Sequence, residues 1–349
     1  MNKTHINIID NLADGNGLSK EEWMCLLTSL DFEERQYLHD KAVAVAKEHY
    51  GNGVFVRALI EISSYCKNNC YYCGIRCSNT NAQRYRLSKE EILNCCGVAA
   101  SFGFNTFVLQ GGEDPKQTPE WIVDVVKSIR DLYPDKAITL SVGECTEEAY
   151  KAFKDAGANR FLLRHETRND AHYSHLHPSN MSAKNRRECL FTLKKLGFQT
   201  GSGMMIGSPG QTDEHLYEDI KFLEELNPHM IGIGPFVPAS NTPFEKESRG
   251  SVEKTILMLS LLRLRFPKVL LPATTALATL CQDGMERAIL AGANVVMPNV
   301  SPLEQRKKYS IYDNKKSTGA ESAQQLSQLE QRLNAIGYHI DYTRGDYKY

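Results

Sequence analysis

The chain of 349 residues is predicted to be an α/β protein, most simply a (β/α)8 TIM barrel, from three observations. Short apolar or β-branched runs alternate with longer amphipathic runs over most of the chain, which is typical of parallel strands joined by helices. Eight strand-like runs can be counted, enough to close a barrel. No G-x-G-x-x-G fingerprint is present, so an open doubly wound sheet is the second choice and a six-strand partial barrel the third.

Composition and charge limit the function classes. Hydrophobic residues make up 42% of the chain and charged residues 24%, as in ordinary globular proteins. A net charge of −1 without a basic patch argues against a nucleic-acid partner. No apolar leader and no run of about 18 apolar residues is visible, so we expect a cytoplasmic protein without a membrane span. Ten cysteines then favour a metal site over a disulfide framework.

The chain is predicted to have three parts. Residues 1–53 form a helical extension, in which Ser19 and Glu22 have the spacing of a capping box. Residues 54–300 form the barrel, and residues 301–349 form a polar cap with a helix near 320–336 that packs on the barrel. The predicted strands are 56–62, 106–109, 137–141, 160–163, 203–206, 230–233, 269–272 and 294–297.

The amphipathic runs between these strands begin and end at recognisable residues. Ser88 and Glu91 have the spacing of a second capping box, and Thr118 precedes a proline at the first helical position. Glycines follow several of the runs, where a helix should stop. The predicted helices are 89–100, 119–132, 147–156, 183–196, 213–226, 252–266 and 285–291.

Three cysteines lie just after the first predicted strand, in the spacing C-x3-C-x2-C: Cys66, Cys70 and Cys73. The carboxyl ends of the strands carry the active sites of this fold. A [4Fe–4S] cube needs four ligands, so three thiolates leave one iron open to bind a small molecule. A zinc site, three buried thiols, or a closed cluster with Cys77 as fourth ligand are the alternatives. Because residues 74–76 should lead the chain away, we expect Cys77 to stay outside the cluster.

Further polar residues follow other predicted strands. Gly111, Gly112 and Glu113 follow the second strand, where paired glycines let the backbone approach a ligand and a carboxylate supplies charge. The string RHET follows the fourth strand at 164–167, a composition that suits a barrel mouth better than a core. Arg186 offers a fork of donors for a carboxylate, although a solvated helix face would explain it too.

The C-x3-C-x-aromatic-C loop resembles that of the radical S-adenosylmethionine (SAM) superfamily. The resemblance implies a radical SAM barrel in which Cys66, Cys70 and Cys73 are catalytic and bind a [4Fe–4S] cluster. The open iron would hold SAM and cleave it reductively to methionine and a 5′-deoxyadenosyl radical. The residues implied to contact SAM are Tyr72, Gly111, Gly112, Glu113, Glu166 and Arg186.

Six strings in this order are similar to the HydE family of [FeFe]-hydrogenase maturases: 73–76, 164–167, 204–212, 232–238, 272–276 and 292–299. That resemblance implies assembly of the two-iron part of the hydrogenase H-cluster. The substrate would be a cysteine-bound iron carbonyl cyanide complex from another maturase, with ferredoxin or flavodoxin as electron donor. A second cluster is not expected, because no cysteine follows Cys281. The implied substrate-binding residues are Gln110, Thr139, Arg164, Met230, Thr274, Thr275, Met297 and Tyr312.

Other functions stay open at this stage. A methylornithine synthase would need acidic partners for the substrate amine. A biotin synthase would need grouped cysteines on later strands, and those after residue 100 are isolated. A hypothesis from another class is a non-catalytic iron–sulfur or zinc scaffold.

Overall fold

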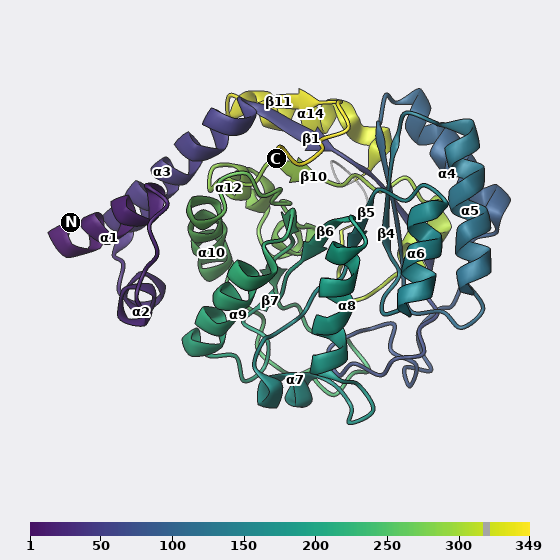
Figure 1. The fold of residues 1–349 in the computed structure, drawn as a ribbon, viewed down its shortest axis with the longest axis horizontal. Helices are drawn as coiled ribbons and strands as arrows, with labels where there is room; N and C mark the ends of the chain where they lie inside the picture. Colours follow the sequence, from purple (N-terminus) through teal and green to yellow (C-terminus); the bar gives the residue numbers. More distant parts are fainter. Residues whose placement is uncertain (317–321) are drawn as a thin grey trace.

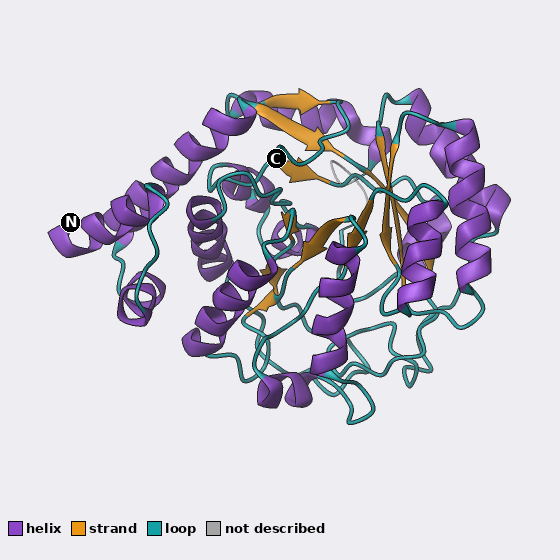
Figure 2. Cartoon of the chain, viewed as in Figure 1, coloured by secondary structure: helices purple, strands orange, loops and turns teal. Residues whose placement is uncertain are grey.

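The computed structural model describes residues 1–316 and 322–349. Its centre is a parallel sheet surrounded by helices (Figures 1 and 2), which confirms the α/β class. Six strands form this sheet in the order β2-β3-β4-β5-β6-β8, and every neighbouring pair is parallel. They are β2 (Ala58–Ser63), β3 (Thr106–Gly111), β4 (Ala137–Ser141), β5 (Arg160–Leu162), β6 (Gln199–Ser202) and β8 (Met230–Ile231).

The described strands do not form one closed ladder of eight. Single parallel bridges instead continue the ring from Met230 to Leu270, from Pro272 to Val295, and from Asn299 back to Leu59 in β2. The remaining strands form a sheet β10-β1-β11 and a pair β7-β9. Their bounds are β1 (Gly53–Val56), β7 (Met205–Ile206), β9 (Gly234–Pro235), β10 (Val295–Val296) and β11 (His339–Asp341).

Two strand predictions are wrong in detail. The first predicted strand is two strands, because the chain leaves one sheet at Arg57 and enters another. The prediction of a fifth strand at 203–206 missed β6, where polar and small residues pair with β5. A pattern of apolar residues does not detect such a strand, because its neighbours bury it whatever its composition.

The predicted helices between the strands are present. Their ends agree within a few residues, and both capping boxes form, at Ser19 and at Ser88. They are α4 (Lys89–Ser101), α5 (Pro119–Leu132), α6 (Glu147–Asp155), α8 (Ala183–Lys195), α9 (Asp213–Leu226), α10 (Val252–Arg265) and α12 (Gly284–Ile289). None of the described helices is long and apolar enough to cross a membrane.

The two ends of the chain flank the barrel. The amino-terminal helices are α1 (Lys3–Ala13), α2 (Lys20–Thr28) and α3 (Phe32–Tyr50), and α3 packs along α10. The carboxyl-terminal part contains α13 (Leu303–Lys308) and α14 (Leu326–Ala335), while positions 320 and 321 of the predicted helix lie outside the described residues. Strand β11 was not predicted, and it pairs with β1. The division into three parts at 1–53, 54–300 and 301–349 stays a prediction.

Alternation along the strands separates the outside of the barrel from its inside. In β2, Ile60 and Ile62 pack into the main hydrophobic core beneath the helices. Glu61 between them therefore points inward, and its side chain is fully buried. Because the strands are parallel, all their carboxyl ends meet at one mouth of the barrel and all their amino ends at the other. These mouths are called the carboxyl end and the amino end below.

Candidate active site

The cysteine loop, residues 64–88, leaves β2 at the carboxyl end and returns at the start of α4. Cys66, Cys70 and Cys73 are partly buried in it. Neighbouring segments hold the loop through its backbone: the Lys67 amide donates to the Glu113 carbonyl at 2.8 Å, and the Tyr71 amide donates to that of Leu176 at 3.0 Å. The three thiols thus sit where two other loops fix the chain.

The three thiols influence one another. Burial raises the pKa of Cys73 to about 12, and the neighbouring Cys66 adds to the rise. Burial raises the pKa of Cys70 well above its usual range, and the charge of Cys73 raises it further. Burial also raises the pKa of Cys66. A bound metal would reverse these shifts, because a coordinated thiol loses its proton.

A single ion and a cluster make different demands on the three thiols. Among the residues that the structure describes, no group of three His, Cys, Asp or Glu side chains is arranged to hold one metal ion. A tetrahedral zinc site places all its ligands on one ion. An iron–sulfur cube takes each thiolate on a different iron, so its ligands stand farther apart.

The expectation that residues 74–76 lead the chain away from the loop is wrong. The Cys77 amide donates to the Asn68 carbonyl at 2.9 Å, so the chain folds back beside the cysteines. Cys77 is nonetheless exposed, and its charge is only a minor influence on the pKa of Cys66. The assignment of three ligands without Cys77 stays a prediction.

The loop after β3 packs against the cysteine loop at Gly112. A Cβ on Gly112 would lie 2.2 Å from the Tyr65 carbonyl oxygen and 2.7 Å from the Cβ of Cys66. Glycine is needed here because of this close approach of two backbones. Of the predicted pair Gly111–Gly112, Gly112 therefore allows the loop after β3 to pack directly against the cysteine loop.

Glu113 is held by a second glycine. A Cβ on Gly143, whose φ is +87°, would lie 2.0 Å from the Cγ of Glu113. The Glu144 amide donates to Glu113 Oε1 at 3.1 Å, and the Lys67 ammonium lies 3.3 Å from Oε2. The carboxylate is 10% exposed and faces the cysteine loop through Lys67.

Arg186, from α8, is buried and paired. Its Nε lies 2.7 Å from Glu144 Oε1, and the side chain is 9% exposed, so it is not part of a solvated helix face. Burial acts to lower the pKa of Arg186, but the charges of Glu144, Tyr173, Tyr72 and Glu113 together outweigh burial, and the pKa is raised. Glu144 thus contacts two of the three charged residues predicted to bind SAM, Glu113 through its amide and Arg186 through its side chain.

Glu166 adopts a backbone conformation that is rare outside glycine. Its φ is +66°, and its amide donates to the Gly203 carbonyl at 3.1 Å. Its carboxylate forms an ion pair with Arg164 Nη2 at 2.7 Å. Left-handed residues that are not glycine carry strain and cluster at functional sites, so this outlier supports a role for Glu166.

Tyr72 pairs with a histidine beside the cysteine loop, whereas the histidine of the RHET string lies in the core. The Tyr72 hydroxyl lies 3.1 Å from His177 Nε2, and burial, followed by the charge of Glu166, raises the pKa of Tyr72 well above its usual range. His165 is buried between Ser202, at 2.9 Å, and Asp219, at 3.2 Å. His165 is therefore a structural histidine in the core.

Comparisons with known proteins identify the family. The Radical SAM superfamily model matches residues 60–223. The [FeFe] hydrogenase maturase subunit HydE of Thermotoga maritima is 45% identical over 271 residues, which cover 78% of this chain and 77% of the relative. The chain belongs to the HydE family of radical SAM proteins.

Other relatives of this HydE-family protein share the fold more widely. The 3-methylornithine synthase of Methanosarcina acetivorans is 31% identical over 84% of each chain. A crystal structure of methylornithine synthase (PylB) superimposes with a TM-score of 0.84 and 27% identity over 96% of this chain and 97% of that one. A structure of HydG, at 23% identity and a TM-score of 0.83, covers 97% of this chain and 76% of that one, and shows the fold alone.

Membership of this family implies a [4Fe–4S] cluster and SAM, and the residues at the carboxyl end fit both. The three thiols form a soft donor set for iron. Glu113 and Arg186 offer opposite charges to the two ends of an amino-acid head group.

The structure places the predicted substrate residues on several elements of the barrel. Gln110 donates to the Tyr309 hydroxyl at 3.4 Å, and the charge of Tyr312 acts on Arg164, so these lie near the cysteine loop. Thr274 and Thr275 lie at the start of α11 (Thr275–Leu280). Thr139 and Met230 line a small cavity toward the amino end, and Met297 packs on the apolar cluster that contains Met230. Their role in substrate binding stays a prediction.

Sequence reasoning missed three charged residues. Glu144 directly follows Gly143 after a predicted strand, which is the signal that selected Glu113. Glu61 and Lys315 form a buried ion pair at 2.5 Å, and Glu61 Oε2 has no further partner. Nothing in the sequence joins them, because 254 positions separate the two residues.

Proposed function

We propose that this protein is a radical SAM enzyme that acts in assembly of the two-iron part of the [FeFe]-hydrogenase H-cluster. The observation that carries the proposal is the 45% identity to the HydE subunit over most of both chains. The geometry of the carboxyl end supports it: one mouth of the barrel brings together three thiols, a glycine-supported carboxylate and a buried arginine.

In this proposal each residue has a separate task. Cys66, Cys70 and Cys73 hold the cluster, and Tyr72 covers it. When bound, the cluster and SAM supply reductive cleavage of a sulfonium carbon–sulfur bond. Arg186 binds the SAM carboxylate and Glu113 its ammonium, each through charge-assisted hydrogen bonds. Glu166 binds the ribose or the ammonium, with Arg164 fixing its carboxylate.

The substrate is proposed to be a cysteine-bound iron carbonyl cyanide complex supplied by another maturase, and a ferredoxin or flavodoxin supplies electrons. The protein would work in the reducing cytoplasm, since all ten of its cysteines are free thiols. An anionic complex suits the guanidinium groups that face the barrel interior, such as Arg164.

The experiment has two stages. Anaerobic reconstitution with iron and sulfide, followed by dithionite and SAM, should give 5′-deoxyadenosine. Supplying the chain to a host that lacks its own HydE should restore hydrogenase activity. Failure of the first stage with a four-iron protein would favour a non-catalytic scaffold.

A second candidate is a methylornithine synthase, favoured by one observation. The buried carboxylate of Glu61 faces the barrel interior with one oxygen unpartnered, as a site for a substrate amine requires. Incubation with lysine and SAM distinguishes the two: 3-methylornithine as product would replace the maturase proposal. Sulfur insertion into a biotin precursor would point to the biotin synthases instead.

A further inference from the structure

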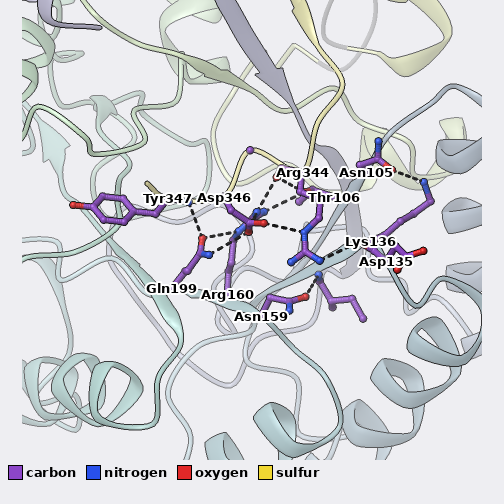
Figure 3. Close-up of polar contacts among 12 residues, drawn as sticks. Asn105, Thr106, Asp135, Lys136, Asn159, Arg160, Gln199, Arg344, Asp346 and Tyr347 are labelled. Carbon is purple, nitrogen blue, oxygen red and sulfur yellow. Dashed lines mark hydrogen bonds and ion pairs between the residues drawn. The ribbon is translucent and has the colours of Figure 1, made fainter. Parts of the chain in front are cut away.

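The end of the chain covers the amino end of the barrel, opposite the cysteine loop. Residues 342–349, called the strap below, follow β11 and cross the first residues of several parallel strands. Figure 3 shows Arg344 and Asp346 of the strap among side chains from the starts of β3, β5 and β6, namely Thr106, Arg160 and Gln199.

Polar contacts hold the strap. Arg160 Nη2 donates to Asp346 Oδ1 at 2.6 Å and to the Arg344 carbonyl at 2.8 Å. Gln199 Nε2 also donates to Asp346 Oδ1, at 3.1 Å, and the Thr106 hydroxyl donates to the Arg344 carbonyl at 2.9 Å. Gly345 is the one buried residue of the strap. The strap also makes apolar contacts: Tyr347 packs on the apolar cluster that contains Met230 and Leu270, and the centre of its ring lies 4.9 Å from that of His229.

A buried guanidinium lies directly behind the strap. Arg57 is 1% exposed, and its Nη2 donates to the Gly345 carbonyl at 3.1 Å. Among the described residues, the other contact of its guanidinium is the Met230 sulfur at 3.1 Å, its Nε has no partner, and no carboxylate pairs with it. The Gly345 carbonyl of the strap is therefore its one oxygen partner there.

A small cavity separates the strap from the barrel interior. It holds about 10 Å³, room for about one water, and Arg57, Thr139, Arg160, Met230 and Leu270 are among its lining residues. The Thr139 hydroxyl in its wall is buried without a partner. Apolar side chains, Phe161, Leu162, Met230 and Leu270, form part of the wall, but burying an unpartnered hydroxyl costs free energy, so stability alone does not explain Thr139.

We propose that the strap is a releasable closure, and that its release opens a second route into the barrel at the amino end. The two guanidiniums at this opening, Arg57 and Arg160, make the route selective for small anions over cations. Molecules could then pass without displacing what the carboxyl end binds. The inference stands independently of the proposed reaction.

The test measures access to the cavity by thiol labelling of the full chain, with no cluster needed. The reporter is Leu270→Cys, because Leu270 lines the cavity and is 1% exposed. Methanethiosulfonate reagents of negative and positive charge are applied, and each thiol is followed by peptide mass spectrometry. Cys96, fully buried behind the sheet, reports global unfolding in the same sample.

In the reporter background, Asp346→Ala and deletion of residues 344–349 should each raise labelling at position 270 by about tenfold or more, since a charge-assisted contact is lost. Cys96 labelling should not change, and the negative reagent should react faster than the positive one. Asp346→Asn should give a smaller rise. Asp155→Ala, which removes an exposed carboxylate paired with Lys151, is the matched control and should have no effect.

Three results would overturn the proposal. First, the labelling rates of position 270 and Cys96 could rise together in every variant, which would show that the strap only stabilises the fold. Strap variants could label at the rate of the Asp155→Ala control. Equal rates for the two reagents would remove the anion-selective route.

Discussion

The two ends of this barrel are built in opposite ways. At the carboxyl end, close backbone packing fixes the site: Gly112 and Gly143 admit contacts that any side chain would block. At the amino end, residues 342–349 are held by side-chain hydrogen bonds, the ion pair Arg160–Asp346 and the packing of Tyr347. We therefore expect the candidate active site to tolerate less change than the opposite mouth.

The largest expected effect lies at the cysteines. Cys70→Ala should abolish cluster binding, because a cube that loses one of three thiolates has too few ligands. Cys77→Ala is the matched control and should retain full iron and sulfide content after anaerobic reconstitution. Loss of iron in the Cys77→Ala protein would show that the wrong three ligands were chosen.

The second largest effect is expected where Gly112 packs against the cysteine loop. Gly112→Ala forces the Tyr65 carbonyl and Cys66 apart, so we expect a loss of about 1–3 kcal/mol in unfolding free energy together with poorer cluster loading. Gly97→Ala in α4 is the control, since its nearest neighbour would be 3.6 Å away and helix propensity favours alanine. Denaturant unfolding and iron analysis measure both. Equal behaviour of the two variants would remove the packing argument.

A moderate effect is expected for the residue that joins the predicted SAM ligands. Glu144→Ala should weaken SAM binding about tenfold, because buried Arg186 loses its charge partner. Glu144→Gln should lose less. On α8, the helix of Arg186, Glu188→Gln breaks only the exposed pair with Lys184 and serves as control. Titration of the reconstituted proteins with SAM measures the Kd of each variant. An unchanged Kd in Glu144→Ala would show that Glu144 does not position Arg186 for SAM.

The smallest effect concerns pH at the strap. Burial acts to raise the pKa of Asp346, but Arg160 and Arg344 together outweigh burial, and the pKa lies below its ordinary value. The carboxylate therefore stabilises the folded strap fully above the unfolded value of about 4, and this contribution is lost as pH falls through the folded pKa. Since Asp346 is 38% exposed, the effect should be at most about 1 kcal/mol.

Hydrogen exchange of residues 342–349 checks this prediction. Exchange corrected for its intrinsic pH dependence should accelerate in acid, while exchange in the core strands should not. The Asp346→Asn protein should show no such acceleration. A strap that exchanges identically in both proteins at every pH would contradict the role of the ion pair.

The sequence by itself determined the α/β class, the helix ends and the family. These follow from short-range signals: capping residues such as Ser88, the alternation of apolar runs, and three cysteines within eight positions. The cysteine spacing selected the cluster loop for the same reason, since neighbouring positions in a chain cannot lie far apart.

Only the tertiary structure decided which distant residues meet. The last residues of the chain lie on Arg160, Glu61 meets Lys315, and Glu144 joins Glu113 to Arg186. Strand β6 likewise exists because its neighbours pair with it, and not because of its composition. Such contacts depend on how the whole barrel closes, and a local pattern of residues carries no record of that closure.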